Sequence, residues 1–395
     1  MTLSQPPLLA DVRSRVEEVR DEIVAIRRDL HAHPELGWNE VRTTGLIRQR
    51  LTAAGLSPQV LPTGTGLICD IGSGDTCIAL RADIDALPVP DGSDSPFRST
   101  QEGIAHACGH DVHTAALLGA ALVLARMAAE GELNHRVRLI FQPAEEVMPG
   151  GALGVIAAGG MEGVRRIYGL HCDPRLPVGQ VGLRVGALTA AADRILVRLT
   201  GPGGHTSRPH LTGDLVYALA TVVTELPAAL SRRVDPRAGM SLVWGRITAG
   251  SAANAIPSRG EAEGTLRCLD VNAWRLAAEL IPTVAGQLIA PYGVEVSTEV
   301  THGVPPVMND PGAIDVLRRV VVETIGPDAV ATTDQSLGGE DFAWYLEHVP
   351  GAMARLGVRP AGVDEAADLH TPGFDPDEDA ITIGMTVLAS CALLD

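Results

Sequence analysis

The most concentrated group of reactive side chains lies between His106 and His113. This short stretch holds His106, Cys108, His110 and His113, each with an atom that can bind a first-row metal ion. Cys108 and His110 are two positions apart, so an extended backbone would point both side chains in one direction. The pattern favours a metal site. A polar loop before a helix capped by Asp111, and a nucleophilic cysteine, remain alternatives.

A second group is the adjacent pair Glu145 and Glu146, which follows the apolar run 137–141 and precedes a glycine-rich turn at 149–151. Neighbouring side chains in an extended segment diverge. One carboxylate could therefore hold a metal ion while the other takes a proton from water that the ion activates. A pair of solvated loop glutamates is the alternative interpretation.

Two further histidines stand where strands or loops are expected to end. His171 follows the apolar run 167–170, and His370 lies in a Leu-His-Thr-Pro-Gly segment. A single histidine is more often structural than a ligand, but strand ends in an open α/β sheet face one crevice. We therefore group five candidate ligands: Cys108, His110, Glu146, His171 and His370.

A third region, 201–210, is rich in glycine and contains His205 and Arg208. Glycines allow the backbone to approach a site closely, which would leave His205 prominent. Asn254 and Arg267 follow in the same part of the chain. By composition alone these are ordinary turn and surface residues.

The elements expected to position these residues alternate between helix and strand up to about residue 186. Apolar residues spaced by three and four predict a helix over 12–30. Further helices are expected at 43–54, ending before Gly55, and at 111–130, ending before Gly131. Short strands are expected at 67–71, 77–80, 137–141 and 167–170. This alternation predicts an α/β sheet.

Between about 187 and 302 the order changes to β-α-β-β-α-β, which is typical of a small α+β sandwich. The expected elements are 195–199, 215–230, 241–247, 261–268, 271–289 and 294–300. Helices expected near 313–324 and 379–394 then return to the α/β pattern of the first part of the chain. We predict one domain formed by 1–186 and 303–395, interrupted by a second domain at 187–302.

Composition limits the partners. The formal net charge of −17 disfavours nucleic acid and anionic membrane surfaces.

The segment Met1–Ala10 does not resemble a signal peptide, and no uncharged apolar stretch reaches the length of a membrane span. Six scattered cysteines do not form a disulfide framework in a chain of this length. A cytoplasmic location is expected.

These motifs together resemble the dinuclear-metal aminoacylase/carboxypeptidase superfamily. Within it, they are similar to the branch of hippurate hydrolases, N-acyl-amino-acid amidohydrolases and indole-acetyl-amino-acid hydrolases. The resemblance runs across nearly the whole chain. Besides the blocks above, it includes His33-Pro-Glu-Leu-Gly37, Leu80-Arg-Ala-Asp83-Ile-Asp85-Ala-Leu-Pro88, Asn254 to Pro257 and Gly338-Gly-Glu-Asp-Phe342.

The resemblance implies a metallopeptidase-like catalytic domain with a mostly parallel central sheet, interrupted by an inserted ferredoxin-like α+β domain that serves as lid and dimerisation surface. It implies a metal-dependent amidohydrolase that releases an amino acid and a carboxylic acid from a small N-acyl amino acid. Two divalent ions per subunit are expected, Zn²⁺ or Mn²⁺ first, with Co²⁺ or Ni²⁺ as alternatives. A homodimer through the lid is also implied.

The resemblance also implies residue roles. The five candidate ligands would hold the ions, and the Cys108 thiolate would bridge them. Glu145 would be the general base, and Asp85 would orient His110. Many relatives outside this branch have His-x-Asp where this chain has Asp83-Ile-Asp85, so Asp83 is not assigned as a ligand.

The inserted domain would supply the remaining groups. His205 would stabilise the developing oxyanion, in some relatives from the neighbouring subunit, and Asn254 would assist it. Arg267 would hold the substrate carboxylate. Arg208 is less usual in its loop, and no role is assigned to it.

Three other functions remain open. A dipeptidase or carboxypeptidase would share the chemistry but recognise a free amine on the acyl side. A binding protein could keep the fold without activity, although the ligand and base sets are complete. A thiol hydrolase would use Cys108, and its activity would survive a chelator.

Overall fold

The structure is a computed structural model that describes residues 7–395. Residues 1–6 of the segment on which the expected absence of a signal peptide rested lie outside the described residues. The chain divides into two compact units. The first comprises residues up to Gly186, Asn309–Asp334 and Asp341–Asp395, and the second comprises Ala187–Met308 and Gln335–Glu340.

The return boundary therefore falls at 308/309 and not at the expected 302/303. The reason is that the last strand of the second unit continues its ladder as far as Val304, which pairs with Ala192. Residues Gln335–Glu340 were expected in the first domain but group with the second unit. Ser336 there donates its amide to the carbonyl oxygen of Leu188 at 2.9 Å.

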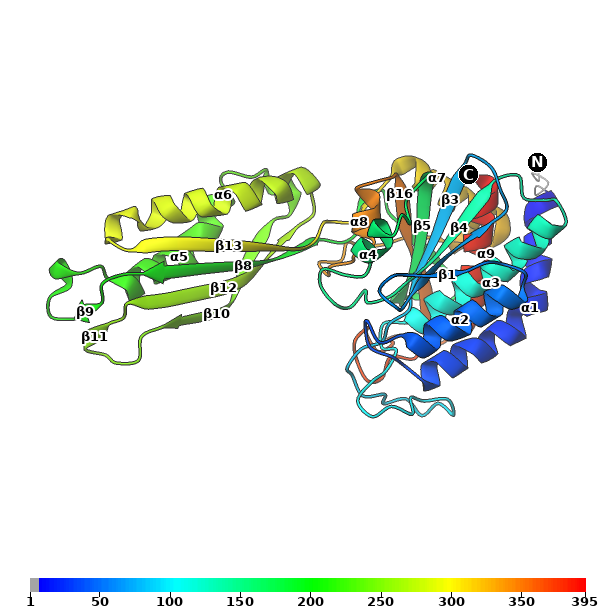
Figure 1. Cartoon of the computed structure of the whole chain (residues 1–395), viewed down its shortest axis with the longest axis horizontal. Coiled ribbons are helices and arrows are strands. Elements are labelled where there is room, and N and C mark those ends of the chain that lie inside the picture. The colour runs from blue at the N-terminus through cyan, green and yellow to red at the C-terminus, as the bar shows by residue number, and fades with distance from the viewer. Residues whose placement is uncertain (1–6) are drawn as a thin grey trace. The chain divides into compact units, whose positions relative to one another are not determined.

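The first unit is built on an eight-stranded sheet in the order β1-β2-β4-β3-β5-β16-β6-β15 (Figure 1). The four central strands β4, β3, β5 and β16 run parallel, while β1, β2 and the β6–β16 contact are antiparallel. The expectation of a mostly parallel sheet is confirmed. The strands are β1 Gln59–Val60, β2 Leu67–Ile71, β3 Cys77–Asp83, β4 Arg136–Gln142, β5 Val164–Pro177, β6 Val181–Leu183, β15 Val330–Thr332 and β16 Gly351–Arg359.

Helices cover this sheet, with α1, α2, α3 and α9 gathered on one side and α4 and α8 on the other (Figure 1). Their bounds are α1 Pro7–Ala32, α2 Val41–Ala53, α3 His110–Ala129, α4 Ala152–Ala157, α7 Pro311–Thr324, α8 Ala343–Leu346 and α9 Asp379–Leu394. The apolar spacing of α1 is explained by burial: Val12, Val16 and Ile23 are completely enclosed. These positions form the amphipathic stripe that the sequence predicted.

Helix α3 is the central helix, and it is mostly apolar and buried on nearly every side. It packs against α1, α9 and the sheet. A Cβ atom on Gly119 would lie 2.1 Å from Sδ of Met385 in α9, so glycine allows the close approach. The helix is long and apolar enough to cross a membrane, but 83% of its apolar window is buried in the protein. Packing therefore accounts for its composition.

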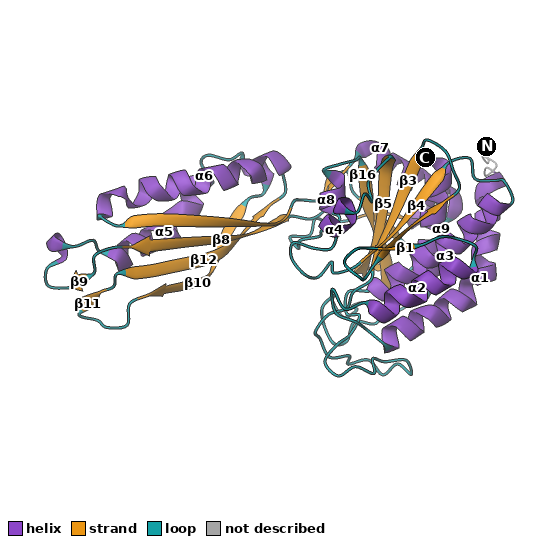
Figure 2. Ribbon diagram, viewed as in Figure 1, coloured by secondary structure: helices purple, strands orange, loops and turns teal. Residues whose placement is uncertain are grey.

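The second unit is a four-stranded antiparallel sheet in the order β10-β12-β8-β13, with α5 and α6 packed against it (Figure 2). Its chain order β8, α5, β10, β12, α6, β13 is the predicted β-α-β-β-α-β order. A two-stranded ladder of β9 and β11 adjoins it. The bounds are β8 Ala191–Thr200, β9 Gly204–His205, α5 Leu215–Leu230, β10 Ser241–Ala249, β11 Ala255–Ile256, β12 Arg259–Cys268, α6 Val271–Ile289 and β13 Glu295–Val304.

The chain leaves the first unit at β7 (Gly186–Ala187) and returns at β14 (Met308–Asn309). Each unit has its own core. In the second unit, apolar residues of β8 and β12 pack against those of α5 and α6, with Ile195, Leu219 and Ile281 among the fully buried ones. Each unit therefore has the buried apolar face that a domain needs.

Candidate metal centre

The segment before α3 places Cys108 and His110. The extended backbone expected here is wrong: residues 107–109 form a turn, closed by a hydrogen bond from the Gly109 amide to the carbonyl oxygen of His106. Gly109 has φ +85° and immediately precedes α3. A side chain at Gly109 would also meet Sγ of Cys172 at 2.7 Å. The turn, and not strand alternation, brings Cys108 and His110 to the same site.

Cys108 lies at the centre of the candidate ligands. Its Sγ atom is 3.6 Å from Nε2 of His171 and 3.3 Å from Nε2 of His370. Nδ1 of His171 lies 2.8 Å from the carbonyl oxygen of Cys172, which fixes Nε2 toward Cys108. The His370 amide donates to the carbonyl oxygen of Ala107 at 2.8 Å, which ties the 370 loop to the Cys108 turn.

The ligand atoms form two groups that share Cys108. One group is Cys108, His110 and His171, and the other is Cys108, Glu146 and His370, with the ligand atoms in each group within 4.8 Å of one another. Two overlapping sets of Cys, His and Glu donors match the chemistry of divalent first-row metals such as Zn²⁺. The structure therefore brings all five predicted ligands together.

Glu145 and Glu146 stand in a turn after β4, so the extended backbone expected here is also wrong. Their side chains do not diverge. Oε2 of Glu145 is 4.0 Å and Oε1 of Glu146 is 3.8 Å from Nε2 of His110. Ala144 has φ +51°, a left-handed conformation that costs an L-residue about 1–2 kcal/mol. The strained turn allows two adjacent carboxylates to face one site.

Two buried carboxylates hold this turn by its backbone, and a third binds the start of α4. Glu40 accepts from the Ala144 amide at 2.7 Å, and Asp85 accepts from the Glu146 amide at 3.0 Å. Asp341 accepts from the Ala152 amide at 3.0 Å. The resemblance singled out the segments of Asp85 and Asp341, but the backbone amides that these carboxylates bind are seen only in the structure.

The surroundings of His110 test whether the site fits metal ions. Nδ1 of His110 lies 3.2 Å from Oδ1 of Asp85, which leaves Nε2 directed at the other candidate ligands. Within residues 7–395 this Nε2 atom is buried without a hydrogen-bond partner. Buried polar atoms are rarely left unsatisfied, so a cation bound to Nε2 would supply the missing interaction. The residues present fit two divalent cations.

The charges around His110 and Cys108 also favour a bound cation. Burial alone lowers the pKa of His110, but Asp83, Asp85 and Glu146 raise it to about 10. Burial, with the charges of Glu146 and Glu145, raises the pKa of the Cys108 thiol well above its ordinary value. Without a cation, Cys108 therefore stays protonated and is a poor nucleophile.

The two outer histidines differ from His110. Burial and the charge of Arg355 hold the pKa of His171 well below its ordinary value, so this imidazole is neutral and available as a ligand. Hydrogen bonding to Glu146 raises the pKa of His370, although burial opposes it. His370 is half exposed, and its Nε2 lies 3.2 Å from Oε1 of Glu146.

Asp83 and His113 form a further possible ligand group with His110, but both are engaged by other partners. The Cys172 amide donates to Nε2 of His113 at 2.8 Å, so the ring proton is on Nδ1, which lies 2.6 Å from Oδ1 of Asp83. Both ring nitrogens of His113 are therefore occupied. Arg81 donates to Oδ2 of Asp83 at 2.7 Å. This buried pairing was not foreseen, and the only sequence signal was the alternation of charged residues at the end of β3.

His106, the fourth residue of the block, is enclosed in the core. Burial lowers its pKa to about 4, so it is uncharged near neutral pH. Its ring nitrogens have no hydrogen-bond partner in the described part of the chain. His106 does not belong to any of the metal-ligand groups found within residues 7–395.

The second unit carries His205, Asn254 and Arg267. Exposed His205 pairs with Ala255 across β9 and β11, which places it beside Asn254, and its Nδ1 accepts from the Ser207 amide at 3.1 Å. Arg267 donates to the carbonyl oxygen of Leu337 in the same unit. Arg208 is exposed beside His205.

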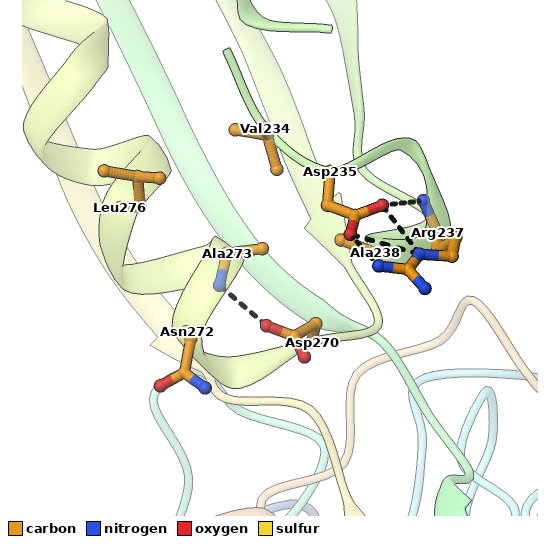
Figure 3. Close-up of a pocket in the computed structure, with 8 residues that line it drawn as sticks. All are labelled: Val234, Asp235, Arg237, Ala238, Asp270, Asn272, Ala273 and Leu276. Atoms are coloured by element: carbon orange, nitrogen blue, oxygen red, sulfur yellow. Dashed lines mark hydrogen bonds and ion pairs between the residues drawn. The ribbon is translucent and has the colours of Figure 1, made fainter.

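A hollow in the second unit, shown in Figure 3, is a different kind of surface. Its carboxylates are engaged locally: Asp235 accepts from the amide of Arg237 at 2.9 Å and pairs with its guanidinium, and Asp270 caps α6 through the Ala273 amide at 2.8 Å. It offers no histidine or cysteine. The hollow is therefore not a metal or nucleophile site.

The fold and the site define a class of two-unit α/β metal-centre hydrolases. The sequence matches the family described as peptidase family M20/M25/M40 over residues 79–394, and the chain belongs to that family. The resemblance seen in the sequence motifs, and the class of metal-dependent amidohydrolase that it implied, are confirmed.

Three similar proteins illustrate the range of the family. The putative glutamate–cysteine ligase 2-3 of Rhodococcus jostii (strain RHA1) is 50% identical over 376 residues, which is 95% of this chain but 47% of that protein. The chain thus spans about half the length of that relative. The N-acetyl-L-cysteine deacetylase of Bacillus subtilis (strain 168) is 39% identical over 368 residues, 91% of this chain and 85% of that protein.

The crystal structure of Bacillus subtilis YxeP is described as that of a dinuclear metal-binding peptidase of the M20 family. It is 34% identical to this chain, with a TM-score of 0.83, and the match covers 95% of this chain and 98% of that one. The shared fold extends over both units.

Proposed function

We propose that this protein hydrolyses the amide bond of small N-acyl amino acids with two divalent cations and Glu145 as general base. The convergence of Cys108, His110, Glu146, His171 and His370 beside Glu145 is the observation that carries the proposal. The deacetylase name of one relative supports an N-acyl amino acid as substrate. Zn²⁺ or Mn²⁺ are the proposed ions, with Co²⁺ or Ni²⁺ as alternatives.

The residues would divide the work as follows. Cys108 belongs to both ligand groups and would help to hold both cations, which would supply Lewis-acid polarisation of the amide carbonyl and an acidified water. Glu145 takes the proton from the attacking water and gives it to the leaving nitrogen. Asp85 keeps Nε2 of His110 directed at the site.

The second unit supplies the remaining proposed groups. His205 and Asn254 stabilise the oxyanion, and Arg267 holds the carboxylate of the amino acid. The positive charge of Arg267 would attract an anionic substrate locally. The net charge of −17 on the whole chain otherwise disfavours such a substrate. Arg208, beside His205, has no assigned role.

A homodimer is part of the proposal. His205 and Asn254 adjoin the start of β12 near Arg259, where Gly201 donates to Ser258, whereas Arg267 stands eight residues further along the strand. At about 3.3 Å per residue, this separation is roughly 26 Å, which exceeds a small substrate. This separation supports the proposal that a second copy of the chain contributes some of the three residues. A cytoplasmic location is proposed from the free cysteines.

A carboxypeptidase or dipeptidase is the second candidate, because the same centre can cleave a peptide bond. A panel of acetyl-, benzoyl- and longer-chain acyl amino acids against dipeptides and blocked peptides separates the two. We expect turnover of the N-acyl amino acids, loss with a chelator and recovery with added metal. Turnover of free dipeptides alone, or activity that resists a chelator and is lost on thiol alkylation, would overturn the proposal.

A further inference from the structure

Glu40 is the residue just before α2, a position whose side chain usually caps the helix. Here it makes no cap hydrogen bond to α2. Glu35 does this instead, because its two carboxylate oxygens accept from the amides of Arg42 at 2.9 Å and Thr43 at 2.8 Å. The Glu40 side chain is completely buried and turns toward a segment more than a hundred residues away.

That segment is the strained turn that carries Glu145. Oε1 of Glu40 accepts the Ala144 amide at 2.7 Å, and Ala144 is the turn residue with φ +51°. On the other side of Glu145, Asp85 accepts the Glu146 amide at 3.0 Å. The amides that flank Glu145 are thus each held by a different buried carboxylate, while the Ala144 carbonyl accepts from Gly151 at 3.0 Å.

Packing in the same segment supports this contact. A Cβ atom on Gly37 would lie 2.8 Å from Cγ2 of Val147 and 3.2 Å from Cα of Ala144, so the backbone at Gly37 rests directly against the turn. The segment 37–40 therefore contacts the turn through both packing and a charged hydrogen bond.

We propose that Glu40 is a positioning residue, which acts through the Ala144 amide to hold Glu145 where it can exchange a proton with water and with the leaving nitrogen. This inference rests on the proposed function. Loss of the hydrogen bond lets Ala144 relax from its left-handed conformation and moves the Glu145 carboxylate, and a displacement of about 1 Å at a reacting group can cost about a hundredfold in rate.

The test compares Glu40→Ala, Glu40→Gln and Glu40→Asp with wild type, on whichever N-acyl amino acid the wild type hydrolyses. Glutamine keeps a carbonyl oxygen for the Ala144 amide, whereas alanine has none and aspartate is one methylene too short. We expect kcat to fall about 10–100-fold in Glu40→Ala, less in Glu40→Asp, and by less than about threefold in Glu40→Gln. KM and metal content should stay at wild-type values.

Glu35→Ala is the matched control, because Glu35 lies in the same segment but its carboxylate accepts from amides at the start of α2. It should lower Tm and leave kcat unchanged. If Glu40→Ala does not fold, Glu40→Asp against Glu40→Gln carries the comparison. An unchanged kcat in Glu40→Ala or Glu40→Asp would overturn the inference, and so would a loss of kcat that accompanies loss of metal or that glutamine does not rescue. Wild-type activity reports on the proposed function independently.

Discussion

Nδ1 of His110 lies 3.2 Å from Oδ1 of Asp85, while Oδ2 of Asp85 accepts the backbone amide of Glu146 at 3.0 Å. One carboxylate thus fixes two candidate ligands from different parts of the chain. It sets the ring orientation of His110 and the position of the turn that carries Glu146. The ligand groups depend on this contact as much as on the ligands themselves.

Asp85→Asn should therefore weaken metal binding without unfolding the protein. The amide group cannot accept hydrogen bonds with both of its atoms, so either His110 or the Glu146 amide loses its partner. We expect metal affinity to fall about 10–100-fold, as measured by isothermal titration with Zn²⁺ or Mn²⁺. Asp21→Asn is the control, because that carboxylate is almost fully exposed on α1. Equal affinities in the two variants would contradict the assignment.

Glu145→Gln and Glu146→Gln should fail in different ways. The first variant should retain metal and lose at least about a hundredfold in kcat, because the amide cannot accept the proton from water. The second should lose metal, because Glu146 shares a ligand group with Cys108 and His370, whereas Glu145 is assigned the base role. Elemental analysis and steady-state kinetics on both proteins measure the difference. Near-normal turnover in Glu145→Gln would show that the roles are misassigned.

Removal of metal should lower the thermal stability of the protein. Asp83, Asp85, Glu145 and Glu146 all lie around His110 and then have fewer positive charges nearby. Binding to the folded state alone stabilises by about 3–4 kcal/mol when the free metal exceeds Kd by a hundred- to a thousandfold. Calorimetry with chelator, then with excess metal, should show a reversible drop in Tm. A Tm that is indifferent to both would exclude a tight metal centre.

Glu378 gives the stability a pH dependence away from the metal centre. Burial alone raises its pKa, but hydrogen bonding to Arg28 at 2.9 Å and the charges of Arg27 and Arg28 lower it below the ordinary 4.5. Because the pKa is lower in the folded state, the contribution to stability is complete above about pH 5 and is lost as pH falls below 4.5.

Glu378→Gln should consequently reduce the free energy of unfolding by about 1 kcal/mol at pH 7, with a smaller difference at pH 4. Urea unfolding at the two pH values measures both differences. Arg20→Gln is the comparison variant, because Arg20 forms an ion pair with Asp379, the residue that follows Glu378. A loss of unfolding free energy in Glu378→Gln that is larger at pH 4 than at pH 7 would contradict this prediction.

The elements could be predicted from the sequence because their signals are local. Helix α6 spans the predicted 271–289, α5 the predicted 215–230 and α9 the predicted 379–394. Apolar spacing of 3.6 residues marks α5 and α6, whereas α9 is apolar along its whole length because it is buried on nearly every side. The ladder of β13 could not be delimited in this way, since its extension to Val304 depends on pairing with β8.

The candidate ligands could also be named from the sequence, because Cys, His and Glu donors are few and their motifs are specific. The direction of the backbone at these residues could not be predicted from the sequence. Both segments expected to be extended, at Cys108 and at Glu145, are turns, and their conformations depend on distant contacts with Cys172 and Glu40. Local alternation of side chains carries no information about those contacts.

By itself, the sequence determined the order of the elements, the donor types and the family, since these reside in local spacing and in motif identity. Only the tertiary structure decided that both ring nitrogens of His113 are bonded, to Asp83 and Cys172, and that the buried Glu40 and Asp85 hold the turn of Glu145. Those pairings join residues far apart in the chain. They form because a buried donor or acceptor must find a partner wherever folding brings one within reach.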